Sequence, residues 1–310
     1  MKLISIVTPC YNEELNVEEV YSQVKDLFKT KLKNYKYEHI FIDNASTDAT
    51  VSILKKLAAK DKNLKIIINS RNFGHIRSPY YGLLQANGDA VISLVSDLQD
   101  PVELILDFVR EWESGYKIVV GVKNQSHESP LFFFIRKMYY NLISRLSDVK
   151  LIKNFTGFGL YDKKIIQILR KIDDPYPYLR GLISDIGFEV KKIPYVQPVR
   201  TRGFTKNNFY TLYDIGMLGI TNHSKIPLRL AVFGGFVLGF FSLIMAILQL
   251  ILKLLYWDTY SFGSTTIVIA IFFFSSVQLF FIGIIGEYIG SIHTQVLKRP
   301  VVIEEQRVNF

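Results

Sequence analysis

The chain has 310 residues, enough for one large domain or two ordinary ones. Hydrophobic residues make up 49% of it while charged residues still reach 21%, which indicates a soluble part joined to membrane spans. The net charge of +9 indicates an anionic partner, and the single cysteine, Cys10, excludes an internal disulfide.

Residues 1–122 alternate short β-rich runs with longer segments of helical spacing. The runs are ISIVTP, YEHIFID, LKIIINS, AVISLVSD and YKIVVGV. Residues 13–31 and 47–60 place apolar side chains at helical intervals. This order predicts an α/β, doubly wound, mostly parallel sheet that binds a nucleotide at the carboxyl ends of its strands.

Residues 130–146 combine large apolar side chains with Arg136, Lys137 and Arg145. This composition predicts a helix on a membrane surface, and the alternative is a buried amphipathic helix. We expect a second interfacial helix at about 207–222. The first ten residues contain no long signal-peptide core, so the N-terminus is expected to stay in the cytoplasm.

Two long stretches near the end of the chain, 230–252 and 261–286, carry no charge. The first, as a helix, spans about 35 Å, against a hydrocarbon core of roughly 30 Å. We therefore predict a transmembrane hairpin with helices at about 229–253 and 261–287.

Positive residues before the first span and after the second favour a multi-pass protein of the inner (cytoplasmic) membrane with both ends inside. These residues are Lys225, Arg229, Lys298 and Arg299. The predicted organisation is a cytoplasmic catalytic domain at 1–228, the hairpin within 229–290, and a cytoplasmic tail at 291–310.

Carboxylates at predicted strand ends are the first indication of chemistry. Asp43 and Asp97 close two of the runs, and Asp48 and Asp100 follow them. Such groups can bind a ribose or base, or ligate a divalent ion on a diphosphate. The alternative is that Asp43 and Asp48 cap the helices that follow.

An ordered set of motifs extends along nearly the whole chain: SIVTPCYNEELN, IDNASTDAT, SRNFGH, SDLQDP, RTRGFTKNNFYTLYD, PLRL, GEYIGSIH and KRP. In order and spacing it resembles family 2 glycosyltransferases. The closer resemblance is to the polyprenyl-phosphate branch, which includes bactoprenol glucosyltransferases and dolichyl-phosphate mannose synthase. It implies a GT-A-type fold and transfer of one sugar to a lipid phosphate.

The resemblance also implies roles for individual residues. Asp97 and Gln99 would hold Mg²⁺ or Mn²⁺ on the donor diphosphate. The residues implied in nucleotide-sugar binding are Pro9, Tyr11, Glu13, Asp43, Asn72, His75 and Asp97. Three positions depart from the family pattern. The usual Asp-x-Asp reads Val95-Ser96-Asp97, the usual paired aspartates read Asp43-Asn44, and residues 156–160 read TGFGL where many relatives carry an aspartate.

A phosphate acceptor requires positive charge and no general base, because the monoester is already mostly ionised at pH 7. The region 190–213 contains basic residues and no acidic one. We expect the acceptor phosphate to contact Arg136, Arg145, Arg200 and Arg202, and Arg202 and Lys206 to act in catalysis beside Asp97 and Gln99. The alternative is a basic face attracted to anionic lipid.

The predicted reaction is an inverting, metal-dependent transfer of a single sugar, with UDP-glucose to undecaprenyl phosphate as the best match. Its product is a lipid-linked sugar for modification of cell-envelope glycans. The alternatives are a membrane-bound processive polysaccharide synthase and a catalytically silent relative that binds nucleotide. The expected partners are the donor, the lipid acceptor and the bilayer, with a homo-oligomer indicated by GxxxG spacing and no nucleic acid.

Overall fold

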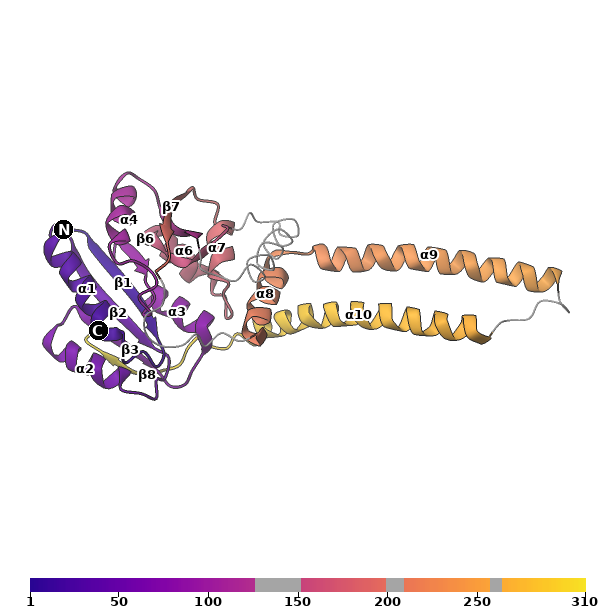
Figure 1. Cartoon of the computed structure of the whole chain (residues 1–310), viewed down its shortest axis with the longest axis horizontal. Coiled ribbons are helices and arrows are strands. Elements are labelled where there is room, and N and C mark those ends of the chain that lie inside the picture. Colours follow the sequence, from indigo (N-terminus) through magenta and orange to yellow (C-terminus); the bar gives the residue numbers. More distant parts are fainter. Residues whose placement is uncertain (126–151, 199–208, 257–263) are drawn as a thin grey trace.

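The structure, a computed structural model, describes residues 1–125, 152–198, 209–256 and 264–310. These residues form an α/β part at one end and two long helices that project from it (Figure 1). The strands are β1 Leu3–Cys10, β2 Lys36–Asp43, β3 Leu64–Asn69, β4 Ala90–Ser93, β5 Ile118–Gln125, β6 Phe155–Asp162, β7 Val190–Val196 and β8 Glu304–Val308. The helices are α1 Val17–Thr30, α2 Thr50–Lys60, α3 Gly74–Gln85, α4 Leu104–Glu113, α6 Lys163–Ile172, α7 Leu179–Asp185, α8 Phe209–His223, α9 Ile226–Leu255 and α10 Ser264–Leu297.

The described strands form one eight-stranded sheet in the order β7-β5-β6-β4-β1-β2-β3-β8. Strand β1 pairs in parallel with both β2 and β4, and β2 pairs in parallel with β3. Strand β6 runs antiparallel between β4 and β5. Cys10 lies opposite Asp43 in the β1–β2 register, so the carboxyl ends of these two strands are level.

Helices cover both faces of the sheet. Along β1, Ile4 and Ile6 face a core that includes α1, α2 and α4, whereas Val7 faces a core that includes α3, α6 and α7. A strand buried on both faces reads as a nearly continuous apolar run, which explains the runs in the sequence. The predicted doubly wound, mostly parallel fold is confirmed.

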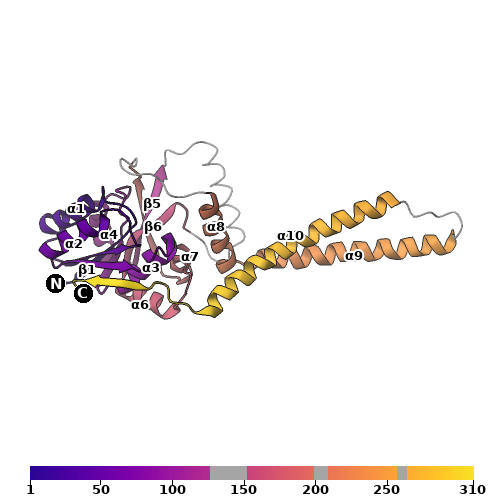
Figure 2. The same ribbon diagram turned by 90° about the horizontal axis from the view of Figure 1, so that it is seen from below.

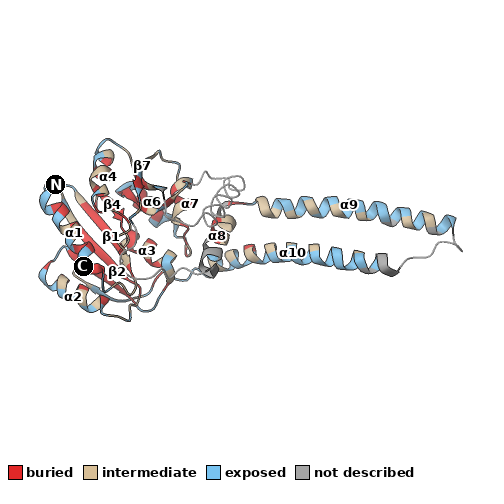
Figure 3. Cartoon of the chain, viewed as in Figure 1, coloured by how far each residue is buried: buried red, intermediate tan, exposed pale blue. Residues whose placement is uncertain are grey.

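Helices α9 and α10 expose apolar side chains along almost their whole length (Figure 3). Phe236 is 75% exposed and Phe272 71% exposed, and both helices are long and apolar enough to cross a membrane. The predicted first span, 229–253, lies within α9. The predicted second span begins among residues outside the described range and lies otherwise within α10, which continues to Leu297.

The two predicted interfacial segments have different outcomes. Helix α8 covers the described part of 207–222, so a helix forms there, and its place at a membrane interface stays a prediction. The segment 130–146 lies outside the described residues.

The chain returns to the sheet after α10, as Figure 2 shows. The sequence predicts a tail from residue 291, but α10 runs to Leu297 and residues 304–308 form β8, antiparallel to β3. The last strand therefore belongs to the same sheet as the N-terminal strands.

Candidate active site

The order of the strands creates a topological switch point beside β1. The chain runs from β1 to β2 and β3 on one side and then crosses to β4 on the other side. Connections leave the carboxyl ends of β1 and β4 in opposite directions, and ligands of open α/β sheets bind at such a switch point. Tyr11 follows β1, Asp43 ends β2 and Asp97 lies in the loop after β4. The sheet therefore brings these three predicted site residues to one edge.

The loops after β1 and β2 are joined by hydrogen bonds. Asn12 donates its backbone N–H to Ser46 Oγ at 2.9 Å, and its side-chain oxygen accepts from the Thr47 N–H at 2.7 Å. Glu13 donates its N–H to Thr50 Oγ1 at 2.9 Å. These contacts fix Tyr11 and Glu13, which are half-buried, beside the end of β2 before any ligand arrives.

Asp43 is fully buried at the end of β2. Its carboxylate accepts from the Ser46 hydroxyl and from the Ser46 N–H, the latter at 2.9 Å. Burial raises the pKa of Asp43, and the bonds from Ser46 oppose that rise. In this structure the side chain shapes the loop, and its contact with a nucleotide stays a prediction.

Asp48 lies just before Ala49, the N-cap residue of α2, so it is not itself the cap that the alternative interpretation describes. Its two carboxylate oxygens accept from the N–H of Thr50 at 3.0 Å and from the N–H of Glu14 at 3.2 Å. Thr50 is the first residue of α2. Asp48 therefore joins the start of α2 to the loop after β1.

Asn44 explains why this chain departs from the paired aspartates. Its amide NH₂ donates to Asn72 Oδ1 at 2.8 Å and to the Gly74 carbonyl at 3.2 Å, and its oxygen accepts from the Phe73 N–H at 2.8 Å. An ionised aspartate has no proton to donate to these acceptors. The asparagine thus binds the loop after β3, which carries the predicted residue Asn72, to the end of β2.

His75 lies in the first turn of α3. The pKa of its imidazole is lowered because the surrounding protein limits its hydration and because Arg180 is near, while Asp214 acts in the opposite direction. These two charges come from α7 and α8, so His75 is on the side of the site where those helices lie.

The loop after β4 presents Asp97. One carboxylate oxygen accepts from the Gln99 N–H at 3.1 Å. No residue in the described ranges donates to the second carboxylate oxygen. Leu98, between Asp97 and Gln99, has φ 58°, a left-handed backbone conformation that residues other than glycine rarely adopt. Such strain is typical of functional loops.

Asp100 attaches this loop to strand β7. It is buried and accepts a hydrogen bond from the Tyr195 hydroxyl of β7 at 2.6 Å. Burial raises the pKa of Asp100 to about 6, against the opposing effects of Tyr195 and Lys123. Sequence reasoning did not find Tyr195, because it lies far along the chain in a strand with no motif.

The residues of the Asp97 loop fit a divalent ion that also takes ligands from the substrate. The described residues contain no group of three or more His, Cys, Asp or Glu side chains placed to hold a metal alone. Magnesium commonly uses one or two carboxylates together with water and substrate phosphates. Asp97 and Gln99, both half-buried on a strained loop, offer this kind of partial site.

The residues predicted to bind the acceptor phosphate, Arg136, Arg145, Arg200, Arg202 and Lys206, lie outside the described residues.

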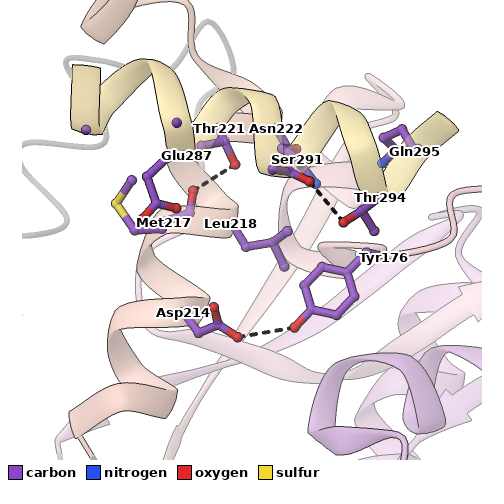
Figure 4. Close-up of a pocket in the computed structure, with 13 residues that line it drawn as sticks. Tyr176, Asp214, Met217, Leu218, Thr221, Asn222, Glu287, Ser291, Thr294 and Gln295 are labelled. Atoms are coloured by element: carbon purple, nitrogen blue, oxygen red, sulfur yellow. Dashed lines mark hydrogen bonds between the residues drawn. The ribbon is translucent and has the colours of Figure 1, made fainter. Parts of the chain in front are cut away.

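A cavity of about 470 Å³ lies between α8, α10 and Tyr176, which belongs to the connection from α6 to α7 (Figure 4). The Tyr176 hydroxyl donates to Asp214 at 3.4 Å, and Ser291 donates to Asn222 at 3.0 Å across the two helices. Its described lining contains the carboxylates of Asp214 and Glu287 and no lysine or arginine. The described lining is therefore unsuited to a phosphate group.

The mostly parallel sheet with acidic loops at its switch point defines a GT-A-type α/β protein. Residues 5–169 match the model of the family described as Glycosyl transferase family 2. The chain belongs to this family, and it is a glycosyltransferase.

Relatives match over nearly the full length. The chain is 34% identical over 304 residues to the uncharacterized glycosyltransferase YkcC of Bacillus subtilis (strain 168), with 97% of this chain and 93% of the relative covered. It is 31% identical over 301 residues to the bactoprenol glucosyl transferase of Shigella phage SfII, with 97% and 96% covered. A solved glucosyl-3-phosphoglycerate synthase from Mycobacterium tuberculosis is 16% identical, covers 71% of this chain and 78% of that chain, and has a TM-score of 0.47.

Proposed function

We propose that this glycosyltransferase moves a single glucose from UDP-glucose to the phosphate of undecaprenyl phosphate or another polyprenyl phosphate. The observation that carries the proposal is that one chain joins the Asp97 loop to two exposed apolar helices. The name of the phage relative, bactoprenol glucosyl transferase, supports both the sugar and the lipid carrier.

In the proposed reaction, an oxygen of the acceptor phosphate attacks the anomeric carbon of the sugar. The bond from that carbon to the β-phosphate oxygen breaks, UDP leaves with the electron pair, and the configuration inverts. No proton has to be removed, because the acceptor phosphate is mostly ionised at pH 7. The chain must therefore supply position and charge rather than a general base.

Asp97 and Gln99 would hold Mg²⁺ or Mn²⁺ against the donor diphosphate. When bound, the ion would neutralise the charge that develops on the leaving group. Arg136, Arg145, Arg200, Arg202 and Lys206 remain the proposed phosphate contacts, since a phosphate monoester requires cations near the anomeric carbon.

The membrane would bring the acceptor to the site. We propose that α9 and α10 cross the bilayer as a hairpin, with the catalytic part of 1–228 in the cytoplasm. The apolar surface of both helices and the positive residues on either side of the hairpin support this topology.

The test is an assay of membranes that contain the full chain, with labelled UDP-glucose and undecaprenyl phosphate. One labelled, acid-labile glycolipid is expected. The same assay over a panel of UDP-galactose, UDP-GlcNAc and GDP-mannose identifies the donor. If no nucleotide-sugar gives a lipid product, the proposal fails, and a polymeric product would favour a processive synthase.

A further inference from the structure

The segment that follows α10, residues 298–308, is here named the return segment. It leaves the long helix and ends in β8, which pairs antiparallel with β3 (Figure 2). The register places Asn69 opposite Glu304 and shifts between Ile68 and Asn69. A shift of this kind lets one strand bend away from its partner, here where β3 passes into the next loop.

The return segment holds the loop after β3, residues 70–74. Ser70 donates its N–H to the Ile303 carbonyl at 3.0 Å, and Arg77 donates to the Pro300 carbonyl at 2.5 Å. The same loop contacts Asn44 through Asn72 and Phe73, as described above. The 70–74 loop is thus hydrogen-bonded at Ser70 to the return segment and at Asn72 and Phe73 to Asn44, at the end of β2.

Side chains strengthen this attachment at the start of β8. Tyr81 of α3 donates its hydroxyl to Glu304 Oε1 at 2.7 Å. Arg307 donates to the same oxygen at 2.6 Å and to Gln85 at 2.7 Å. Glu304 and Arg307 therefore both attach the return segment to α3, the helix that follows the 70–74 loop, and Glu304 does so as the acceptor of Tyr81.

The residue after the return segment, Asn309, is anchored to α2 and to the start of β3. The side-chain NH₂ of Asn309, which follows β8, donates to the carbonyls of Ala58 and Leu64, each at 2.8 Å. These acceptors lie at the end of α2 and the start of β3, at the opposite end of β3 from the 70–74 loop. The chain thus offers a matched control whose contacts do not touch that loop.

We propose that the return segment is a positioning element for the nucleotide-sugar site, and that Tyr81 and Glu304 are positioning residues. They act through the 70–74 loop and Asn44, not by contact with substrate. The same covalent segment connects the loop to α10, so the donor site and the apolar hairpin are mechanically linked. The inference rests on the proposed function, because it takes the 70–74 loop as part of the donor site.

The test compares Glu304→Ala, which removes the acceptor of Tyr81 and Arg307, with Tyr81→Phe and the control Asn309→Ala in the purified full chain. Loss of one hydrogen bond corresponds to about a threefold to tenfold change in an equilibrium constant. Tyr81→Phe should raise the KM for the nucleotide-sugar by that factor and Glu304→Ala by at least as much, with kcat and the KM for the lipid acceptor within about twofold of wild type. Asn309→Ala should lower the thermal midpoint without a change in donor KM.

A second measurement separates this inference from the proposed reaction. Titration with UDP and Mn²⁺ gives a Kd that does not require turnover, and the two positioning variants should weaken it as they raise KM. If wild type binds UDP but makes no glycolipid, the reaction fails while the Kd comparison still decides the inference. An unchanged Kd in Glu304→Ala and Tyr81→Phe, an equal loss in Asn309→Ala, or no UDP binding by wild type would each overturn it.

Discussion

The Tyr195 hydroxyl donates a hydrogen bond to Asp100 over 2.6 Å, and this bond joins strand β7 to the loop that carries Asp97. Asp100 is 4% exposed and Tyr195 6% exposed. A buried acceptor that loses its partner costs the chain roughly 1–3 kcal/mol. The pair therefore supports a loop that is already strained at Leu98.

Tyr195→Phe should lower both the thermal midpoint and the transfer rate, because it leaves Asp100 without this donor and frees the loop to move. The control is Tyr80→Phe, which removes a buried hydroxyl that donates to the Leu169 carbonyl on the other face of the sheet. Tyr80→Phe should affect the thermal midpoint alone. If both variants lose activity in proportion to stability, Tyr195 has only a structural role.

Asp100 also predicts a pH dependence of stability. Its pKa rises from the ordinary 3.8 to about 6, so the folded chain holds this proton more tightly than the unfolded chain. Below pH 4 the carboxyl is protonated in both states, and above pH 6 the folded chain bears the cost of a buried charge. Stability from this group is therefore lost as pH rises from 4 to 6, by about 3 kcal/mol.

Asp100→Asn removes this titration and keeps the shape of the side chain. The difference in thermal midpoint, wild type minus variant, should fall as pH rises from 4 to 7. Because other titrating groups are common to both proteins, the difference isolates Asp100. A difference that is flat or rises over this range contradicts the raised pKa.

Asp97→Asn tests the proposed metal site. The amide keeps one oxygen but loses the charge that would attract a divalent ion, so transfer should fall by ~10²-fold or more. Excess Mn²⁺ should restore part of the activity, and the thermal midpoint should stay close to that of wild type because Asp97 is only half-buried. Asp107→Asn on α4, also a carboxylate-to-amide change, serves as the control. Equal activity of Asp97→Asn and wild type would exclude Asp97 as a ligand.

The sequence allowed the sheet and the strand-end position of Asp43 to be predicted, because apolar runs and helical spacing are local signals. The sequence predicts that Asp97 closes its strand as well, but β4 ends at Ser93 and Asp97 lies in the loop that follows. The sequence did not predict β8, whose residues EEQRV are charged and have no alternating apolar pattern. Tyr195 and Asp100 meet only through the order of the strands, which no short motif encodes. The sequence shows that Asn44 departs from the family pattern, but the role of Asn44 depends on acceptors from a different loop.

Asn44→Asp, which restores the residue usual in the family, should destabilise this chain. The ionised side chain would place an oxygen against Asn72 Oδ1 and the Gly74 carbonyl, both of which now accept from the amide. The expected cost is about 1–3 kcal/mol, measured as a lower thermal midpoint at pH 7. Acidification should reduce the deficit, since a protonated carboxyl can donate one bond. A variant as stable as wild type at pH 7 would contradict this account of Asn44.

The position of β8 predicts how this enzyme can be made soluble. A chain cut after residue 225 loses both apolar helices and also β8, which exposes the edge of β3. Replacing residues 226–297 with a flexible Gly/Ser linker keeps the strand. The Tyr288 hydroxyl donates to the Ser224 carbonyl at 2.7 Å, so α10 passes the end of α8 before it continues to Leu297. The remaining helix is about 13 Å long, and a linker of about 12 residues has a mean span near 20 Å, which is enough to join the two ends. The linked form should melt at a higher temperature than the cut form and should bind UDP more tightly. Equal melting temperatures would mean that β8 contributes no stability to the sheet without the hairpin.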